Sequence, residues 1–318
     1  MLDVRRLRLL RELAHRGTIA AVADALAFTP SAVSQQLSAL EREAGLPLLE
    51  RTGRRVVLTP AGRTLVGHAE AVLEQLERAA AELAHARHGL AGPLRIGTFS
   101  SAARTMIPAA LLALAQRHPG LEPMLSEIDP AGVADAIRAG ELDVALIHEY
   151  DFVAARPEPG LATAPLCAED MYLAWSASHA PSADLSAGVG ISGGVGISGG
   201  GAPAAIGAWC AAPWITATPG TMCHEMTIRA CQAAGFSPYV RHRVDYFGAV
   251  LALVASGQGV ALVPELGLTD PLPSGVVLTP VPMSRRTKIA FRSGADGHPA
   301  VAAISEALRS AVPEPLRR

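Results

Sequence analysis

The chain of 318 residues lacks several features that mark common classes of protein. No apolar run approaches the length of a membrane-spanning helix, and the charged start at Asp3, Arg5 and Arg6 does not resemble the apolar core of a secretory signal. The four cysteines form no C-x-x-C pair. We therefore expect a cytoplasmic protein with reduced thiols and no membrane partner.

Positive charge is also scarce and unevenly distributed. Lys288 is the only lysine, and the formal net charge of −2 excludes a polybasic protein that coats nucleic acid. Residues 1–60 nevertheless hold nine arginines and six acidic residues, a local balance of +3, so the remaining residues sum to −5. A basic patch on a near-neutral chain of this length is typical of a specific DNA-binding domain joined to a separate sensing domain.

A helix-turn-helix pattern occupies residues 18–37. Thr18 is a suitable N-cap for a helix over residues 19–26. Thr29 is a suitable N-cap for a second helix with Pro30 at its first position, where the missing N–H leaves no hydrogen bond unmade.

The second predicted helix has two unlike faces. Apolar side chains recur at a 4-3-4 spacing and are expected to face the core: Val33, Leu37, Leu40 and Ala44. The opposite face carries short or amide-bearing side chains that can read base edges in the major groove: Ser31, Ser34, Gln35 and Ser38. We interpret this helix as a recognition helix, with Thr18, Thr29 and Pro30 on the same DNA-binding surface. The alternative is a surface helix that is merely polar outside.

A short β-hairpin is predicted next, with strands over residues 48–51 and 54–58 around Thr52 and Gly53. Arg51, Arg54 and Arg55 lie at its tip. Arginines in such a wing suit phosphate contacts or insertion into a minor groove. The alternative for each of them is a solvated charged turn.

A long helix is predicted over residues 60–88, with Thr59 as its cap. Small and apolar side chains repeat every seven residues for about three heptads, which is the pattern of a coiled coil: Leu65, Ala69, Val72, Leu76, Ala79 and Leu83. We expect this helix to form a homodimer, which would place two recognition helices on an inverted repeat. The alternative is a helix packed on its own domain.

Residues 2–88 resemble the LysR-type transcriptional regulators. The match covers residues 2–8, the helix-turn-helix, residues 40–52 and residues 58–62. Family members commonly read Ser-Gln-Pro-Ala-Leu-Ser-Arg-Gln-Ile where this chain reads Thr29-Pro-Ser-Ala-Val-Ser-Gln-Gln-Leu37, so the family's glutamine is Pro30 and its arginine is Gln35. A side-chain contact from Pro30 does not carry over, because proline has no side-chain donor. The resemblance implies a non-enzymatic regulator that binds double-stranded promoter DNA as a homodimer or homotetramer.

Residues 93–312 show strands that alternate with helices, which predicts a parallel sheet covered on both faces. Predicted strands lie at residues 94–98, 121–127 and 142–147, and predicted helices at residues 102–117, 132–139, 222–234 and 247–256. Ligands on such sheets bind beyond the carboxyl ends of the strands. Side chains at such positions are Ser100, Ser101, His148, Glu149, Thr218 and Phe247.

The resemblance implies that this region is an α/β periplasmic-binding-protein-like effector domain with two lobes. Lobe one would take residues 93–165 and 270–312, and lobe two residues 166–269. A small anionic or polar effector would bind between the lobes, held by Ser100, Ser101 and Thr218. The whole chain would then be a mainly α winged helix-turn-helix domain (residues 1–59), a linker and dimerisation helix (residues 60–88) and the effector domain (residues 93–312).

Two other functions remain open. A thiol-based redox regulator would use Cys223 and Cys231, and a peroxide-sensing branch of the family carries a nearby pair one residue more widely spaced. Eight residues on one helix separate these cysteines by about 12 Å, too far for a disulfide, so buried structural cysteines are favoured. A solute-binding protein or enzyme on the same scaffold is less favoured, because the sequence shows no catalytic triad or paired-carboxylate spacing.

No cofactor or metal ion is expected, because the spacing of His148, His224 and Glu225 follows no ligand pattern. A six-residue unit is repeated in tandem over residues 188–193 and 194–199. Its glycine content predicts a surface loop that gains little from packing.

Overall fold

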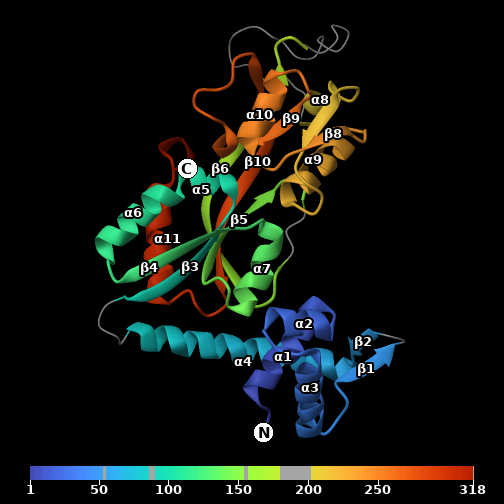
Figure 1. Cartoon of the computed structure of the whole chain (residues 1–318), viewed down its shortest axis with the longest axis vertical. Coiled ribbons are helices and arrows are strands. Elements are labelled where there is room, and N and C mark those ends of the chain that lie inside the picture. The colour runs from blue at the N-terminus through green and yellow to red at the C-terminus, as the bar shows by residue number, and fades with distance from the viewer. Residues whose placement is uncertain (53–54, 86–89, 154–156, 180–201, 318) are drawn as a thin grey trace.

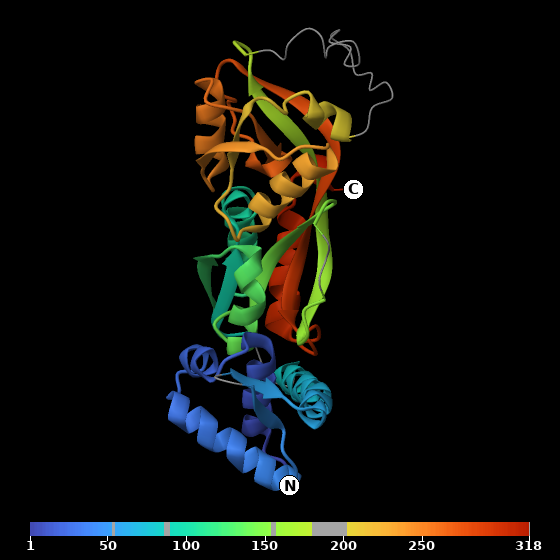
Figure 2. The same cartoon turned by 90° about the vertical axis from the view of Figure 1, so that its right-hand side faces the viewer.

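A computed structural model describes residues 1–52, 55–85, 90–153, 157–179 and 202–317. An N-terminal helical domain lies at one end of the elongated molecule, and an α/β domain of two lobes extends from it along the long axis (Figures 1 and 2). Arg54 and the tandem repeat at residues 188–199 lie outside the described residues, as does the side chain of Arg55.

The N-terminal domain confirms the helix-turn-helix. Its elements are α1 (Val4–Arg16), α2 (Ile19–Ala25), α3 (Pro30–Ala44), β1 (Leu49–Thr52) and β2 (Arg55–Leu58). Thr18 Oγ1 accepts the N–H of Ala21, and Thr29 Oγ1 accepts the N–H of Ala32, as their cap positions predict. The hairpin begins one residue later than predicted, because Glu41 Oε1 accepts the N–H groups of Leu48 and Leu49 and holds Leu48 against the core.

Helix α4 (Pro60–His85) confirms the long helix, and Thr59 Oγ1 accepts the N–H of Gly62 at 3.0 Å. Its heptad stripe divides into two parts. Leu65 and Ala69 pack in the core of the N-terminal domain, whereas four members of the stripe are exposed: Val72, Leu76, Ala79 and Leu83. Ala69 is fully buried within a single chain, so it is not available for the dimer contact that the sequence predicts for it.

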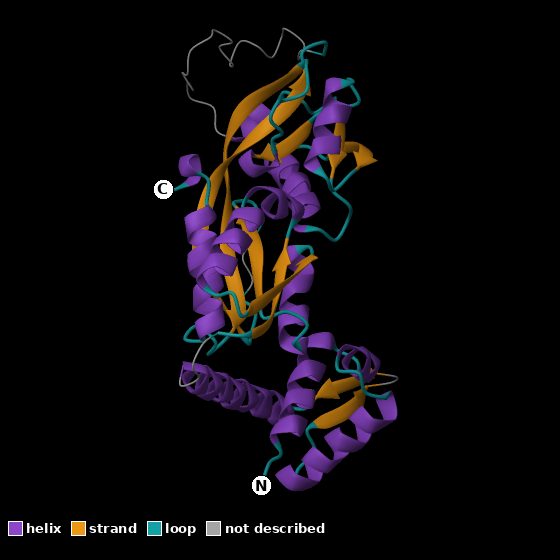
Figure 3. Cartoon of the chain, turned by 60° about the vertical axis from the view of Figure 1, so that its left-hand side comes forward, coloured by secondary structure: helices purple, strands orange, loops and turns teal. Residues whose placement is uncertain are grey.

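The α/β domain is built on one mixed six-stranded sheet of order β4-β3-β5-β10-β6-β9. Its strands are β3 (Gly92–Thr98), β4 (Leu121–Glu127), β5 (Val144–Tyr150), β6 (Leu161–Ser176), β9 (Ala261–Pro264) and β10 (Val276–Arg292). Strands β3, β4 and β5 run parallel, as predicted. Long strands β6 and β10 pair antiparallel and pass through both lobes, so the sheet is not parallel throughout (Figure 3).

Lobe one surrounds β3, β4 and β5 with α5 (Ser100–Thr105), α6 (Ile107–Arg117), α7 (Pro130–Ala139) and α11 (Pro299–Ala311), and a short 3-10 turn, η3 (Glu314–Leu316), follows α11. The sequence predicts one helix over residues 102–117, but the chain breaks at Met106. Pro108 has no N–H to bond the carbonyl of Arg104, so α5 cannot continue into α6.

Lobe two contains α8 (Ala202–Gly207), β7 (Pro213–Thr216), α9 (Met222–Ala233), β8 (Tyr239–Arg243), α10 (Phe247–Ala255) and the 3-10 turn η2 (Glu265–Gly267). Leu272, Val276 and Leu278 pack against α10 in this lobe. The chain therefore returns to lobe one along β10 near Arg285, where pairing with β5 begins, rather than at residue 270. Among the described residues, no helix is long and apolar enough to cross a membrane.

Candidate DNA-binding surface and effector cleft

The exposed face of α3 carries the side chains expected to read DNA. Val33, Leu37 and Leu40 are buried, which turns the opposite face of the helix to solvent. On that face Ser34, Gln35 and Ser38 are exposed and make no side-chain hydrogen bond to any described residue. Their donors and acceptors are thus available to a ligand.

Three other residues of this surface already have partners. Thr18 and Thr29 cap their helices, and the Ser31 hydroxyl lies 3.0 Å from Thr29 Oγ1. Their hydroxyls hold the helix starts in place, and Pro30 occupies the first turn of α3. Arg51 is exposed on β1 at the wing.

A cavity of about 240 Å³ lies between the two lobes. Lobe one contributes residues at or just beyond the ends of β3 and β4, together with one side chain each from β5 and β10: Phe99, Ser100, Ser101, Glu127, Ile128, Asp129, His148 and Arg285. Lobe two contributes residues around the starts of α9 and α10: Ala217, Thr221, Cys223, Asp245 and Phe247. The predicted site at the carboxyl ends of the strands is therefore a real cavity, and Ser100, Ser101, His148 and Phe247 line it.

Arg285 lies at the base of this cavity with only 1% of its surface exposed. Its Nε donates to Glu169 Oε1 at 2.7 Å and its Nη2 donates to Ser101 Oγ at 2.9 Å. Glu169 Oε2 in turn accepts the N–H of Leu266 at 2.7 Å. Burial disfavours the charged guanidinium, but the Glu169 carboxylate outweighs it and raises the pKa of Arg285. The ion pair joins β10, β6, α5 and η2 beneath the cleft.

His148 lies within β5, between the rings of Phe99 and Tyr150 at centroid distances of 4.7 and 5.0 Å. Burial, together with the charge of Arg285, lowers its pKa well below 6.5, so the imidazole is neutral at pH 7. Within the described part of the chain, its buried Nδ1 has no hydrogen-bond partner.

Two expected cleft residues lie elsewhere. Strand β5 extends to Tyr150, so alternation turns Glu149 to the other face of the sheet, where Lys288 Nζ lies 2.6 Å from its carboxylate. Thr218 donates its N–H and its hydroxyl to Asp245 at 2.7 and 2.5 Å, so both donors are used. Neither residue lines the cavity; Thr218 instead positions Asp245, which does.

Sequence reasoning missed several lining residues, among them Phe99, Asp129, Asp245 and Arg285. Asp129 precedes Pro130 and accepts the N–H of Ala131, a capping pattern that was visible in the sequence. Arg285 carried no local signal, because its partner Glu169 is 116 positions away.

Three of the four cysteines, Cys167, Cys223 and Cys231, are poorly suited to redox chemistry, whereas Cys210 is exposed. Cys223 and Cys231 lie on the same helix, α9, and Cys223 Sγ is 3.2 Å from the Tyr150 hydroxyl. Burial raises the pKa of Cys223, and it raises the pKa of Cys231 to about 12 and that of Cys167 to about 11. At these three positions the reactive thiolate is therefore scarce at neutral pH.

Comparison with known proteins agrees with this geometry. Residues 4–63 match the family model described as a bacterial regulatory helix-turn-helix protein of the lysR family, and residues 87–313 match the LysR substrate binding domain. The chain belongs to the LysR-type transcriptional regulators. It is accordingly a DNA-binding regulator with a helix-turn-helix domain and an effector-binding domain.

Individual relatives cover most of this LysR-type chain. It is 30% identical over 303 residues to a probable hydrogen peroxide-inducible genes activator of Streptomyces viridosporus, a match that covers 93% of this chain and 88% of the relative. A full-length OxyR variant from Pseudomonas aeruginosa shares the fold with a TM-score of 0.59 at 21% identity, covering 100% of this chain and 97% of that one. Full-length CbnR complexed with its target DNA has a TM-score of 0.50 at 22% identity, covering 98% and 100%.

Proposed function

We propose that this LysR-type regulator reads an inverted repeat through α3 and senses a small polar effector in the cleft between its lobes. The observation that carries the proposal is the cavity of about 240 Å³ whose wall comes from both lobes. A ligand that contacts both lobes favours a closed arrangement of them, and such a shift in population can change how the DNA is held and bent.

In this proposal Ser34, Gln35 and Ser38 contact base edges, because their side chains are exposed and unpartnered among the described residues. Thr18, Thr29, Pro30 and Ser31 border the contact at the start of each helix. Arginines of the wing contact phosphates or the minor groove: Arg51, Arg54 and Arg55. The CbnR structure, which contains target DNA, supports a role of this kind for the shared fold.

Dimerisation is proposed to use the exposed part of the α4 stripe. Val72, Leu76 and Leu83 expose 39%, 49% and 70% of their surfaces on a helix that extends beyond the N-terminal domain. Ala79 belongs to the same stripe, and Leu65 lies at its inner end. Burying such side chains against a second copy contributes about 25 cal/mol per Å² of apolar surface. Pairs of dimers would give the homotetramer.

The effector is proposed to meet Ser100, Ser101 and Phe247 at the cleft wall and the neutral His148 at its base. Binding, rather than catalysis, is the proposed activity. Because its DNA target lies in the cytoplasm of a bacterial cell, we propose that the regulator acts there. The proposed division is a DNA-binding domain over residues 1–59, a linker helix over residues 60–88 and an effector domain beyond residue 93.

The decisive experiment measures binding of the purified protein to its own promoter region by fluorescence anisotropy, with a scrambled duplex as competitor. Gln35→Ala should lower the preference for the promoter duplex by about 1–3 kcal/mol, the range for one bidentate base contact. Gln232→Ala, an exposed glutamine on α9, is the matched control. Equal losses on both duplexes would reject base reading by Gln35, and no binding at low salt would reject the function.

A thiol-based sensor is the second candidate. It is favoured by the hydrogen peroxide-inducible activator among the relatives and by the place of Cys223 in the cleft wall. Against it stands the pKa of the half-buried Cys223 thiol, which burial raises. Cys223→Ser should therefore leave regulation intact, and a variant that no longer responds to peroxide in a promoter–reporter assay would favour the thiol mechanism instead.

A further inference from the structure

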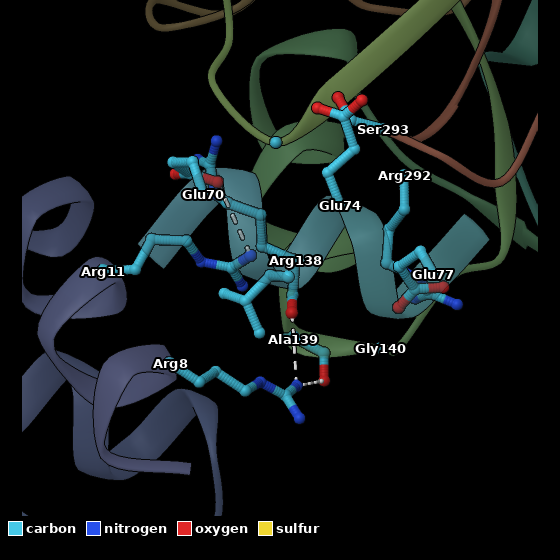
Figure 4. A pocket seen from close by; sticks show the side chains of 12 residues that line it. Arg8, Arg11, Glu70, Glu74, Glu77, Arg138, Ala139, Gly140, Arg292 and Ser293 are labelled. Atoms are coloured by element: carbon cyan, nitrogen blue, oxygen red, sulfur yellow. Dashed lines mark hydrogen bonds and ion pairs between the residues drawn. The ribbon is translucent and has the colours of Figure 1, made fainter. Parts of the chain in front are cut away.

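Two cavities of the molecule differ in how their charges are balanced. The first, of about 350 Å³, lies where α1 and α4 meet the ends of α7 and β10 (Figure 4). Arginines from both domains line it, and three of them are paired with carboxylates: Arg11 with Glu12 at 2.7 Å, Arg138 with Asp135 at 2.7 Å and Arg292 with Glu77 at 3.0 Å. These pairs leave little charge to attract a ligand there.

The cleft between the lobes instead has an excess of negative charge. Three carboxylates line it: Glu127 and Asp129 from lobe one, and Asp245 from lobe two. None of the three forms an ion pair with a described residue. Arg285 at the base of the cleft does not balance them, because its own partner is Glu169 at 2.7 Å.

Two of these carboxylates belong to opposite lobes. Asp129 precedes α7 in lobe one, where its carboxylate accepts the N–H of Ala131 at 2.9 Å. Asp245 lies just before α10 in lobe two and accepts the N–H and the hydroxyl of Thr218. Burial raises the pKa of Asp129, and the negative charge of Asp245 raises it further, so the two carboxylates interact across the cleft. Their repulsion opposes a closer approach of the lobes.

A buried polar group without a partner lies in the same cavity. His148 lines it with 3% of its surface exposed, and its Nδ1 has no hydrogen-bond partner in the described part of the chain. Burial and the charge of Arg285 keep the pKa of His148 well below 6.5. A neutral imidazole retains one nitrogen that accepts a hydrogen bond, so it suits a ligand that donates N–H groups, and it does not repel a cation.

Part of the wall is apolar, which favours an organic ligand over a metal ion. Ile128, Ala217 and Phe247 line the cavity, whose volume is about 240 Å³. Among the described residues, no three side chains of His, Cys, Asp or Glu are grouped so that they could hold a metal ion. The face of an aromatic ring such as that of Phe247 also attracts a cation.

We propose that the effector of this cleft is a small organic cation, an ammonium or guanidinium group on an apolar body. This inference rests on the proposed function, because it takes the cleft between the lobes as the effector site. The cationic group binds between Asp129 and Asp245, with His148 as an acceptor, and the apolar body contacts Phe247. A carboxylate or phosphate would meet the same negative charges, so the anionic effector that the sequence allowed is disfavoured.

The proposal also explains how binding could change the arrangement of the lobes. A cation between Asp129 and Asp245 neutralises one carboxylate from each lobe and removes the repulsion that opposes closure. It therefore has a higher affinity for the closed arrangement than for the open one, which is the condition for a shift in population.

The test is titration calorimetry of the full-length protein with ligands of one shape and different charge: benzylamine, benzylguanidine, benzyl alcohol and benzoate. We expect one of the two cations to bind about tenfold more tightly than benzyl alcohol, since a charge-assisted hydrogen bond is roughly twice as strong as a neutral one. Benzoate should bind more weakly than benzyl alcohol. The cation that binds more tightly names the group.

A conservative variant tests the charge itself. Asp129→Asn removes the charge but keeps a side chain that can cap α7. It should weaken binding of the cation about tenfold and leave the affinity for benzyl alcohol unchanged, a difference that misfolding would not produce. Asp3→Asn makes the same exchange at the cap of α1 in the DNA-binding domain, and it should bind each ligand as the parent does.

Ser100→Trp fills the cleft and separates this proposal from the proposed function. It should abolish binding of the cation. If benzoate binds most tightly and Ser100→Trp abolishes that binding, the cleft is the effector site but the cation is wrong. Absence of binding by both cations, or parental affinity for them in Asp129→Asn, would overturn the proposal, whereas selective binding to promoter DNA would still support the regulator.

Discussion

The buried ion pair of Arg285 and Glu169 supports a quantitative prediction about what holds the effector cleft together. Both side chains are almost fully buried, with 1% and 2% of their surfaces exposed. Glu169→Met leaves a guanidinium in the interior with Ser101 as its remaining hydrogen-bond partner among the described residues, beside the Phe99 ring. Removing one member of a buried pair costs about 3–5 kcal/mol, because the remaining charge keeps its desolvation penalty.

The double variant separates this charge effect from loss of packing. Arg285→Met alone should also cost about 3–5 kcal/mol, so independent effects would add to roughly 6–10 kcal/mol. Replacing both charges removes the unpaired ion and leaves chiefly the Leu266 N–H without its acceptor, a loss of about 1–3 kcal/mol. We therefore expect the double variant to be more stable than either single variant.

The assay is urea unfolding followed by tryptophan fluorescence. All three tryptophans, Trp175, Trp209 and Trp214, belong to or pack against one core of lobe two, so the signal reports on the effector domain. Losses that simply add in the double variant would refute the argument. A single variant that loses less than about 1 kcal/mol would refute it as well, because it would show that the pair is solvated.

Three further predictions follow from individual residues. The folded state keeps His148 neutral while the unfolded chain binds a proton near pH 6.5, so stability should be retained above pH 6.5 and fall as the pH is lowered below it. His148→Phe should flatten this slope in urea unfolding, and an unchanged slope would reject the assignment. Leu76→Glu should yield monomers in analytical ultracentrifugation, since it places a charge in the exposed stripe of α4, and an unchanged mass would exclude that interface. Thr218→Val removes one hydrogen-bond donor to Asp245 but no side chain that lines the cavity, so it should lower effector affinity less than Ser101→Val does. If titration calorimetry gave the reverse order, Thr218 would be assigned a direct contact with the effector.

Local features of the sequence predicted the DNA-binding domain well. Caps such as Thr18 and Thr29 set where α2 and α3 begin, and the spacing of Val33, Leu37 and Leu40 decides which face of α3 is buried. These signals act within a few residues, so they survive without knowledge of the fold. The same reasoning placed Ser100, Ser101 and Phe247 in the cleft, because loops after strands lie at a predictable edge of a sheet.

The heptad pattern shows where such reasoning stops. Leu65 and Leu83 belong to the same repeat, yet Leu65 packs into the N-terminal domain and Leu83 is exposed. A heptad repeat defines an apolar stripe on a helix, but it does not show whether each part of the stripe packs against the chain's own domain or against a second copy.

The amino-acid sequence by itself determined the starts of the two helices of the helix-turn-helix, the polar face of the recognition helix and the family of this regulator. Only the tertiary structure decided that Arg285 meets Glu169 and Ser101, from 116 and 184 positions away, and that arginines from two domains line one cavity. The reason is physical: helix caps and periodicity are short-range properties of the backbone, whereas ion pairs across strands depend on sheet register and on how domains close against each other.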